Sequence, residues 1–236
     1  MYISFLLCYN KYMEQRKRYP WRQRCQVFEE RAEEYDNWFE NSLIFDIELA
    51  ALRSVTPDPL RPWVEIGIGP GRFAVGLGTD IGIDPATAAL HFAARRGIAT
   101  IAGIAEELPL ADASMGTVSM LFTLCFLASP KDALTECHRI LRPEGMLLIG
   151  FIPARSAWGD MLARKKKARH PYYRHVRCKT AAETISLLHR AGFSVVKGCS
   201  TLFQPPDQVT RFEEPRSEPD EMAGFCVVTA TKRNSN

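Results

Sequence analysis

The sequence lacks the cysteine pattern of a metal site or of a disulfide framework. Its seven cysteines include no C-x-x-C pair and no nearby histidine at metal-ligand spacing. An odd number of cysteines without a pattern is typical of reduced thiols in the cytoplasm. We therefore expect no metal site and a cytoplasmic location.

Long apolar runs and a strong excess of one charge are also missing. Residues 2–9 are apolar but too short to span a bilayer, and they lack the flanks of a signal peptide, so we expect no membrane partner. Met13 opens a more ordinary start, and residues 1–12 are interpreted as an upstream extension, with a short membrane-associating anchor as the alternative. The net charge of +3 is too small to indicate a nucleic-acid partner by itself.

The chain does contain a glycine turn between a predicted strand and a predicted helix, within residues 64–74. Gly67, Gly69 and Gly71 allow positive φ and remove the Cβ atoms that would hold a ligand away from the backbone. The amides at the start of the next helix then point into the pocket. Asp84 ends the following strand, where a carboxylate can accept hydrogen bonds from both hydroxyls of a ribose.

Two residues favour S-adenosylmethionine over a dinucleotide as the ligand of this turn. The dinucleotide fingerprint requires a small residue at its third glycine position, where this chain has Arg72. Glu65, at the end of the first strand, would repel a pyrophosphate but suits the cationic methionine half of S-adenosylmethionine. For the glycines taken alone, an ordinary turn stays open as an alternative.

Two further motifs follow in order. The pattern G-x-A-E-x-L-P occupies residues 103–109, and E-x-x-R-x-L-x-P-x-G occupies residues 136–145. With these motifs, the chain resembles the class I S-adenosylmethionine-dependent methyltransferases over roughly residues 28–200, above all the small stand-alone enzymes. The resemblance implies an α/β fold: a doubly wound, Rossmann-like, mostly parallel seven-stranded sheet with an antiparallel C-terminal edge hairpin.

The alternation of apolar patterns agrees with a parallel sheet wound on both sides. We expect residues 1–60 to be an extension with cofactor-capping helices, and residues 61–236 to be the core, with a lid insertion at about 153–180. Residues 205–221 are interpreted as a loop. The predicted strands cover residues 63–67, 81–84, 98–101, 118–124, 146–151, 193–199 and 224–231; the predicted helices cover 28–38, 43–53, 86–95, 131–141, 156–169 and 181–191, with another beginning at 72.

The resemblance also implies which residues hold the cofactor. Relatives usually carry an acid at the position of Ile104, where it binds the adenine amino group, so here either Glu106 replaces it or the adenine has only backbone and apolar contacts. Tyr35 is expected to reach the cofactor carboxylate, or else to be a core contact of its helix. The full set is Tyr35, Glu65, Gly67, Gly69, Gly71, Asp84, Pro85, Ala105, Glu106, Phe122 and Thr123.

The methyl acceptor is less well indicated. The fourth strand is not followed by the N/D-P-P-Y/F run of enzymes that methylate base amines or glutamine amides, since residues 123–126 read Thr-Leu-Cys-Phe. Catalytic candidates are Cys125, which is alternatively a small apolar residue finishing a strand, and Tyr173 and His175 in the lid. The spacing does not favour His175 over His170, and either is alternatively a surface residue.

The sequence therefore predicts a methyltransferase that acts on a small-molecule acceptor. One alternative is an RNA or protein methyltransferase, since basic residues cluster within 16–24 and 164–169. Another is a binding protein without turnover, because Ile104 departs from the family pattern and no general base is obvious. Nothing in the sequence indicates the oligomeric state.

Overall fold

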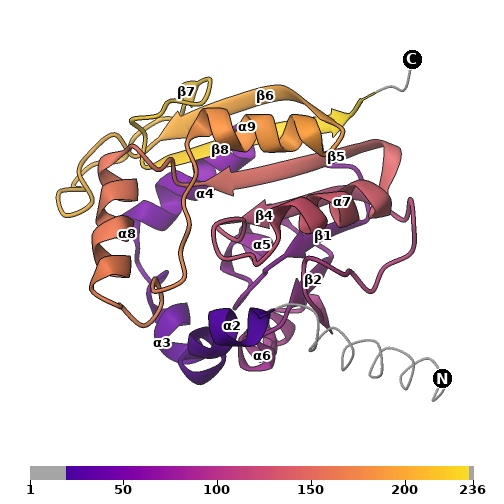
Figure 1. The fold of residues 1–236 in the computed structure, drawn as a ribbon, viewed down its shortest axis with the longest axis horizontal. Coiled ribbons are helices and arrows are strands. Elements are labelled where there is room, and N and C mark those ends of the chain that lie inside the picture. Colours follow the sequence, from indigo (N-terminus) through magenta and orange to yellow (C-terminus); the bar gives the residue numbers. More distant parts are fainter. Residues whose placement is uncertain (1–19, 234–236) are drawn as a thin grey trace.

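A computed structural model describes residues 20–233, so the interpretation of residues 1–12 lies outside the described residues. Its centre is an eight-stranded sheet in the order β3-β2-β1-β4-β5-β8-β6-β7 (Figure 1). The strands are β1 (Trp63–Ile66), β2 (Ile81–Asp84), β3 (Ala99–Ala102), β4 (Met115–Leu121), β5 (Leu141–Phe151), β6 (Phe193–Thr201), β7 (Arg216–Ser217) and β8 (Phe225–Lys232).

Strand directions confirm the predicted fold class. The five neighbouring strands β3, β2, β1, β4 and β5 pair in parallel. Strand β8, in contrast, is antiparallel to both β5 and β6. The sheet has eight strands rather than the predicted seven, because part of the predicted loop 205–221 forms β7, which pairs with Cys199 and Ser200 of β6.

Helices cover both faces of the sheet, which explains why β4 is buried along its whole length. The core on one face includes side chains of α7 and α9, and the core on the other includes α4, α5 and α8 (Figure 1). No helix within residues 20–233 is long and apolar enough to cross a membrane. The helices are α2 (Trp21–Glu30), α3 (Ala32–Asn37), α4 (Leu43–Val55), α5 (Arg72–Leu77), α6 (Thr87–Arg95), α7 (Pro130–Ile140), α8 (Ala157–Lys167) and α9 (Ala181–Arg190).

The predicted helix 28–38 is in fact two helices, α2 and α3. The backbone leaves helical geometry at Arg31, with φ −130° and ψ 37°. The Tyr172 hydroxyl donates a hydrogen bond to the Arg31 carbonyl oxygen at 3.3 Å, across 141 positions of sequence. Because this contact is long-range, the apolar pattern of the segment could not predict it.

Strand β4 ends at Leu121, three residues before the predicted end at 124. The Phe122 amide still donates to the Gly150 carbonyl at 2.8 Å, but Phe122 itself has φ +57°. This positive φ turns the chain out of the sheet at its carboxyl edge. Residues 123–128 consequently form part of the site described below. Strand β5 also begins earlier than predicted, because Leu141 pairs with Met115.

Candidate active site

The glycine turn connects β1 to α5 at the carboxyl edge of the sheet. Gly67, Gly69 and Gly71 have φ values of +74°, +53° and +82°, a region that favours glycine. A Cβ atom at Gly67 would lie 2.2 Å from the Thr123 hydroxyl oxygen, so no larger residue fits there. The turn therefore brings the backbone of β1 directly against the segment that follows β4.

Asp84 supports this turn from the end of β2. Its carboxylate accepts hydrogen bonds from the Gly69 amide at 2.9 Å and from the Ala86 amide at 2.8 Å. Burial raises the pKa of Asp84 to about 6, although these two hydrogen bonds oppose the shift. Asp84, which is predicted to bind the ribose, therefore also fixes the shape of the glycine turn.

Glu65 is a buried acid with an unsatisfied oxygen. Its side chain is only 2% exposed, and Oε2 has no hydrogen-bond partner among the described residues. Burial, and then the nearby charge of Asp84, raise the pKa of Glu65 to about 8. A buried polar atom without a partner costs about 1–3 kcal/mol. A cationic ligand would remove that cost, so the residues here fit the sulfonium and ammonium groups of S-adenosylmethionine.

These groups line a cavity that we call the glycine chamber. It includes every predicted cofactor residue except Gly71, which packs against Ala93 and Ile98 instead. Glu106 lines the chamber, but its Oε1 already accepts hydrogen bonds from the Ala128 and Ser129 amides, at 3.0 and 3.1 Å. This use of Glu106, together with the buried Ile104, favours the alternative in which an adenine has backbone and apolar contacts.

Helix α3 closes the glycine chamber through a cluster of ion pairs. The Asp36 carboxylate accepts hydrogen bonds from Arg72 Nε and Nη2, both at 2.7 Å, and from Arg96 Nη2 at 2.8 Å. Burial alone would raise the pKa of Asp36, but the hydrogen bonds from the two guanidinium groups outweigh it and lower the pKa. Asp36 therefore fixes the neighbouring Tyr35 as a wall of the chamber.

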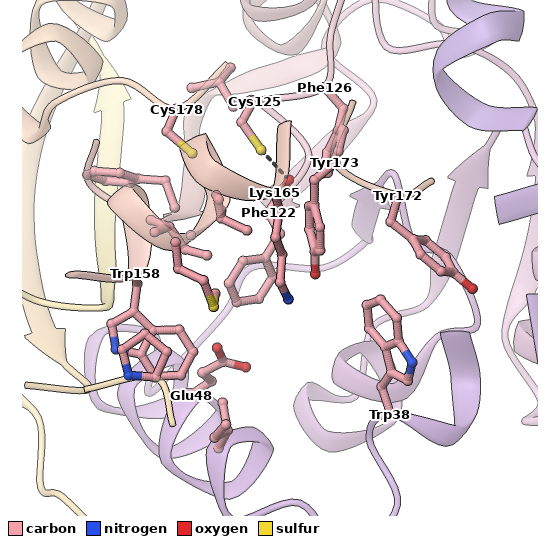
Figure 2. A pocket seen from close by; sticks show the side chains of 18 of the residues that line it. Trp38, Glu48, Phe122, Cys125, Phe126, Trp158, Lys165, Tyr172, Tyr173 and Cys178 are labelled. Atoms are coloured by element: carbon pink, nitrogen blue, oxygen red, sulfur yellow. Dashed lines mark hydrogen bonds between the residues drawn. The ribbon is translucent and has the colours of Figure 1, made fainter. Parts of the chain in front are cut away.

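A second cavity of about 390 Å³ adjoins the first, and we call it the aromatic chamber (Figure 2). Its walls come from α2, α3, α4, the end of β4 and the predicted lid. The two chambers have a common wall, which includes Tyr35, Phe39 and Phe122. Phe122 is held there by stacking on Phe225, with ring centroids 4.7 Å apart.

The structure separates the three catalytic candidates. Tyr173 and Cys125 line the aromatic chamber, but His175 does not. His170, which the spacing could not distinguish from His175, does line it. The Cys125 thiol donates to the Phe122 carbonyl at 3.2 Å (Figure 2). A hydrogen bond with Cys178 and burial raise the pKa of Cys125, which keeps the thiol protonated. Burial likewise raises the pKa of Tyr173 and keeps its phenol neutral.

Sequence reasoning missed Glu48. It lies in α4, lines the aromatic chamber and is only 8% exposed. The available signal was its spacing, because Glu48 lies four and seven positions before the apolar Leu52 and Val55, on the buried side of the helix. The described residues contain no group of three or more His, Cys, Asp or Glu side chains that could hold a metal ion.

Comparisons with known proteins agree with this geometry. A family model described as a methyltransferase domain matches residues 64–149. An uncharacterised protein of Methanocaldococcus jannaschii is 33% identical over 87% of this chain and 98% of its own length. An uncharacterised protein of Mycobacterium tuberculosis is 41% identical over 73% of this chain, but the aligned region spans only 61% of that protein.

A solved structure from Thermotoga maritima is similar over nearly its whole length. It is named as a SAM-dependent methyltransferase, possible histamine N-methyltransferase, and is 33% identical to this chain. The TM-score is 0.82, with 88% of this chain and 99% of that one covered. The chain therefore belongs to the class I S-adenosylmethionine-dependent methyltransferases, and S-adenosylmethionine is its cofactor.

Proposed function

We propose that this protein transfers the methyl group of S-adenosylmethionine to a small molecule bound in the aromatic chamber. The observation that carries the proposal is the wall common to the two chambers, which includes Tyr35 and Phe122. A cavity of about 390 Å³ lies within the size range of small-molecule sites. The Thermotoga relative, named as a possible histamine N-methyltransferase, also favours a small-molecule acceptor.

The chain's own residues would hold the donor and exclude water. Glu65 would pair with the cationic methionine half, and Asp84 would accept hydrogen bonds from the ribose. Bound S-adenosylmethionine supplies an electrophilic methyl group on a sulfonium. The aromatic walls and α3 would keep donor and acceptor aligned in a dry site, and such alignment lowers the barrier of a reaction between two bound partners.

An RNA methyltransferase is the second candidate, favoured by one observation. The last turn of α8 carries four consecutive basic residues, 164–167, at the edge of the predicted lid. Phosphate groups of a nucleic acid would suit such a turn.

The cytoplasmic location also stays a prediction. The six cysteines of the described part are free thiols, which favours a reducing compartment such as the cytoplasm.

Labelled cofactor distinguishes these candidates. The protein is incubated with methyl-labelled S-adenosylmethionine and a cell extract, which is then separated into small-molecule, RNA and protein fractions. We expect label in the small-molecule fraction, and less of it with the Asp84→Ala variant at a cofactor concentration near the Kd of the native protein. Label in RNA that disappears at high salt would support the second candidate. Cofactor binding without any transfer would indicate a binding protein.

A further inference from the structure

Glu48 is a buried acid without a partner in the aromatic chamber. Its carboxylate makes no hydrogen bond and no ion pair with another described residue, and the residue is only 8% exposed. Figure 2 shows its carboxylate pointing from α4 into the space between Trp158 and Trp38. A buried carboxylate is stable only when a cation or several donors accompany it. The chamber therefore presents one unsatisfied acid to whatever binds there.

The basic groups of the chamber do not satisfy this acid. Lys165, His170, Arg177 and Lys179 line the cavity, yet none forms an ion pair with Glu48. The Lys165 ammonium instead lies 5.1 Å from the centroid of the Tyr173 ring. Glu48 is the one acid among the described residues that line this cavity.

The walls around Glu48 suit a positive charge on an apolar body. Trp38 and Tyr172 pack with ring centroids 4.5 Å apart; Trp158 lies on the opposite side of Glu48, and Phe122 lies above Glu48 in the view of Figure 2. Aromatic faces attract cations and bury apolar groups at the same time. The matching ligand has an ammonium group and an aryl or alkyl chain.

Glu48 also lies close to the wall that faces the donor. It lines the aromatic chamber together with Tyr35 and Tyr173. Tyr35 borders the glycine chamber as well. An amine paired with Glu48 would therefore lie beside the boundary that a methyl group has to cross.

We propose that the methyl acceptor is a primary or secondary amine, and that Glu48 binds its ammonium group and accepts its proton. This inference rests on the proposed small-molecule methyl transfer. The ammonium proton passes to the Glu48 carboxylate, which leaves a neutral amine with a free lone pair. The amine nitrogen then forms a bond to the methyl carbon, while the carbon–sulfur bond breaks and its electron pair stays on sulfur. The methylated product carries the positive charge that the sulfonium loses.

The environment of Glu48 supports this role in proton transfer. An alkylammonium has a pKa of about 10, so transfer to an ordinary glutamate with a pKa of about 4.3 is strongly unfavourable. In the empty chamber burial raises the pKa of Glu48 to about 8, which makes its carboxylate a stronger base than an ordinary glutamate. A base matched to its substrate in this way transfers protons efficiently.

Binding of amines without cofactor tests the inference directly. Phenethylamine and n-hexylamine, with 2-phenylethanol and 1-hexanol as uncharged counterparts, are titrated into the protein at pH 8 in a calorimeter. We expect both amines to bind more tightly than the alcohols. The Glu48→Gln variant keeps the shape of the side chain but should weaken amine binding about 10- to 100-fold, leaving the alcohols unchanged.

Asp46→Asn provides the matched control, because Asp46 is an exposed acid on the same helix and does not line the chamber. This variant should bind both amines as the native protein does. Affinity for S-adenosylmethionine, which binds the other chamber, shows that each variant is folded. Amine binding that is insensitive to Glu48→Gln, or no saturable binding of either amine at millimolar concentration, would overturn the inference.

The two proposals fail in different ways. Label transferred to RNA or protein in the extract experiment would contradict the proposed function. Label in a small molecule that is not an amine, such as an alcohol, would leave the proposed function standing and contradict the inference about Glu48 alone.

Discussion

Asp84 has two tasks, since its carboxylate supports the glycine turn and faces the predicted ribose site. We predict that Asp84→Ala weakens S-adenosylmethionine binding by about 1–3 kcal/mol, because hydrogen bonds to a charged acceptor are lost. Calorimetric titration measures the change. Asp58→Ala, at an exposed loop position, should leave the affinity unaltered. Unchanged affinity in Asp84→Ala would mean that the ribose is held elsewhere.

Gly67 allows the close approach of two chain segments, and a second glycine makes its role measurable. Gly67→Ala would place a Cβ atom 2.2 Å from Thr123, whereas Gly97 has a similar φ of +85° but no neighbour within 4 Å. Both substitutions carry the cost of positive φ, about 1–2 kcal/mol. We predict that Gly67→Ala lowers the free energy of unfolding by about 1–3 kcal/mol more than Gly97→Ala does, as measured by urea unfolding. Equal losses would show that Thr123 can move aside.

At the scale of elements, the position of α3 depends on Asp36. Its two guanidinium partners come from the start of α5 and from Arg96, directly after α6. Asp36→Asn leaves both cations without their acid, and we predict a loss of about 1–3 kcal/mol in the free energy of unfolding and weaker cofactor binding. Urea unfolding and titration measure these effects. Glu40→Gln, which removes a more exposed partner of Arg72, should cost less than about 0.5 kcal/mol.

The pH dependence of this ion-pair cluster has a definite sign. The pKa of Asp36 is lowered in the folded protein, so the cluster stabilises the fold above the unfolded pKa of about 3.9. That stability disappears as the pH falls through the lower folded value. The difference between native protein and Asp36→Asn should therefore shrink below about pH 4; a difference that stays constant down to pH 2 would contradict this assignment.

At the scale of the whole molecule, three buried acids favour the protonated state. The pKa values of Glu48 and Glu65 are raised to about 8 and that of Asp84 to about 6, all chiefly by burial. Their contribution to stability is complete below the unfolded pKa of about 4 and is lost as the pH rises through the folded values. The lowered pKa values of His138, His170 and His175 act in the opposite direction near pH 6.

We therefore predict that the Tm of the ligand-free protein falls between pH 7 and 8.5, where the histidines are already neutral. Differential scanning calorimetry across this window measures the slope. Glu48→Gln and Glu65→Gln should each flatten it, because a neutral amide replaces an acid that must ionise inside the protein. Glu214→Gln, at an exposed position, should not change the slope. A Tm that rises over this window would contradict the assignment of these two acids.

The sequence by itself determined the core of the glycine chamber. The strand, turn and next strand between Val64 and Asp84 are neighbours along the chain, and parallel strands bring their carboxyl ends to one edge of the sheet. Glu65, Gly67, Gly69 and Asp84 consequently line one chamber, whereas the six other predicted cofactor residues of that chamber were named from the resemblance to the family. Local spacing is enough for this, because a β-α-β unit has few ways to fold.

Only the tertiary structure decided the aromatic chamber. Glu48 and Tyr173 line one cavity although 125 positions separate them, and the break between α2 and α3 involves a hydrogen bond from Tyr172 of the predicted lid. Patterns of apolar residues predict that a helix face is buried, but they do not predict what it is buried against. For that physical reason the spacing of Glu48 could indicate only that its side chain is buried, and its place in one cavity with the predicted lid became evident only from the tertiary structure.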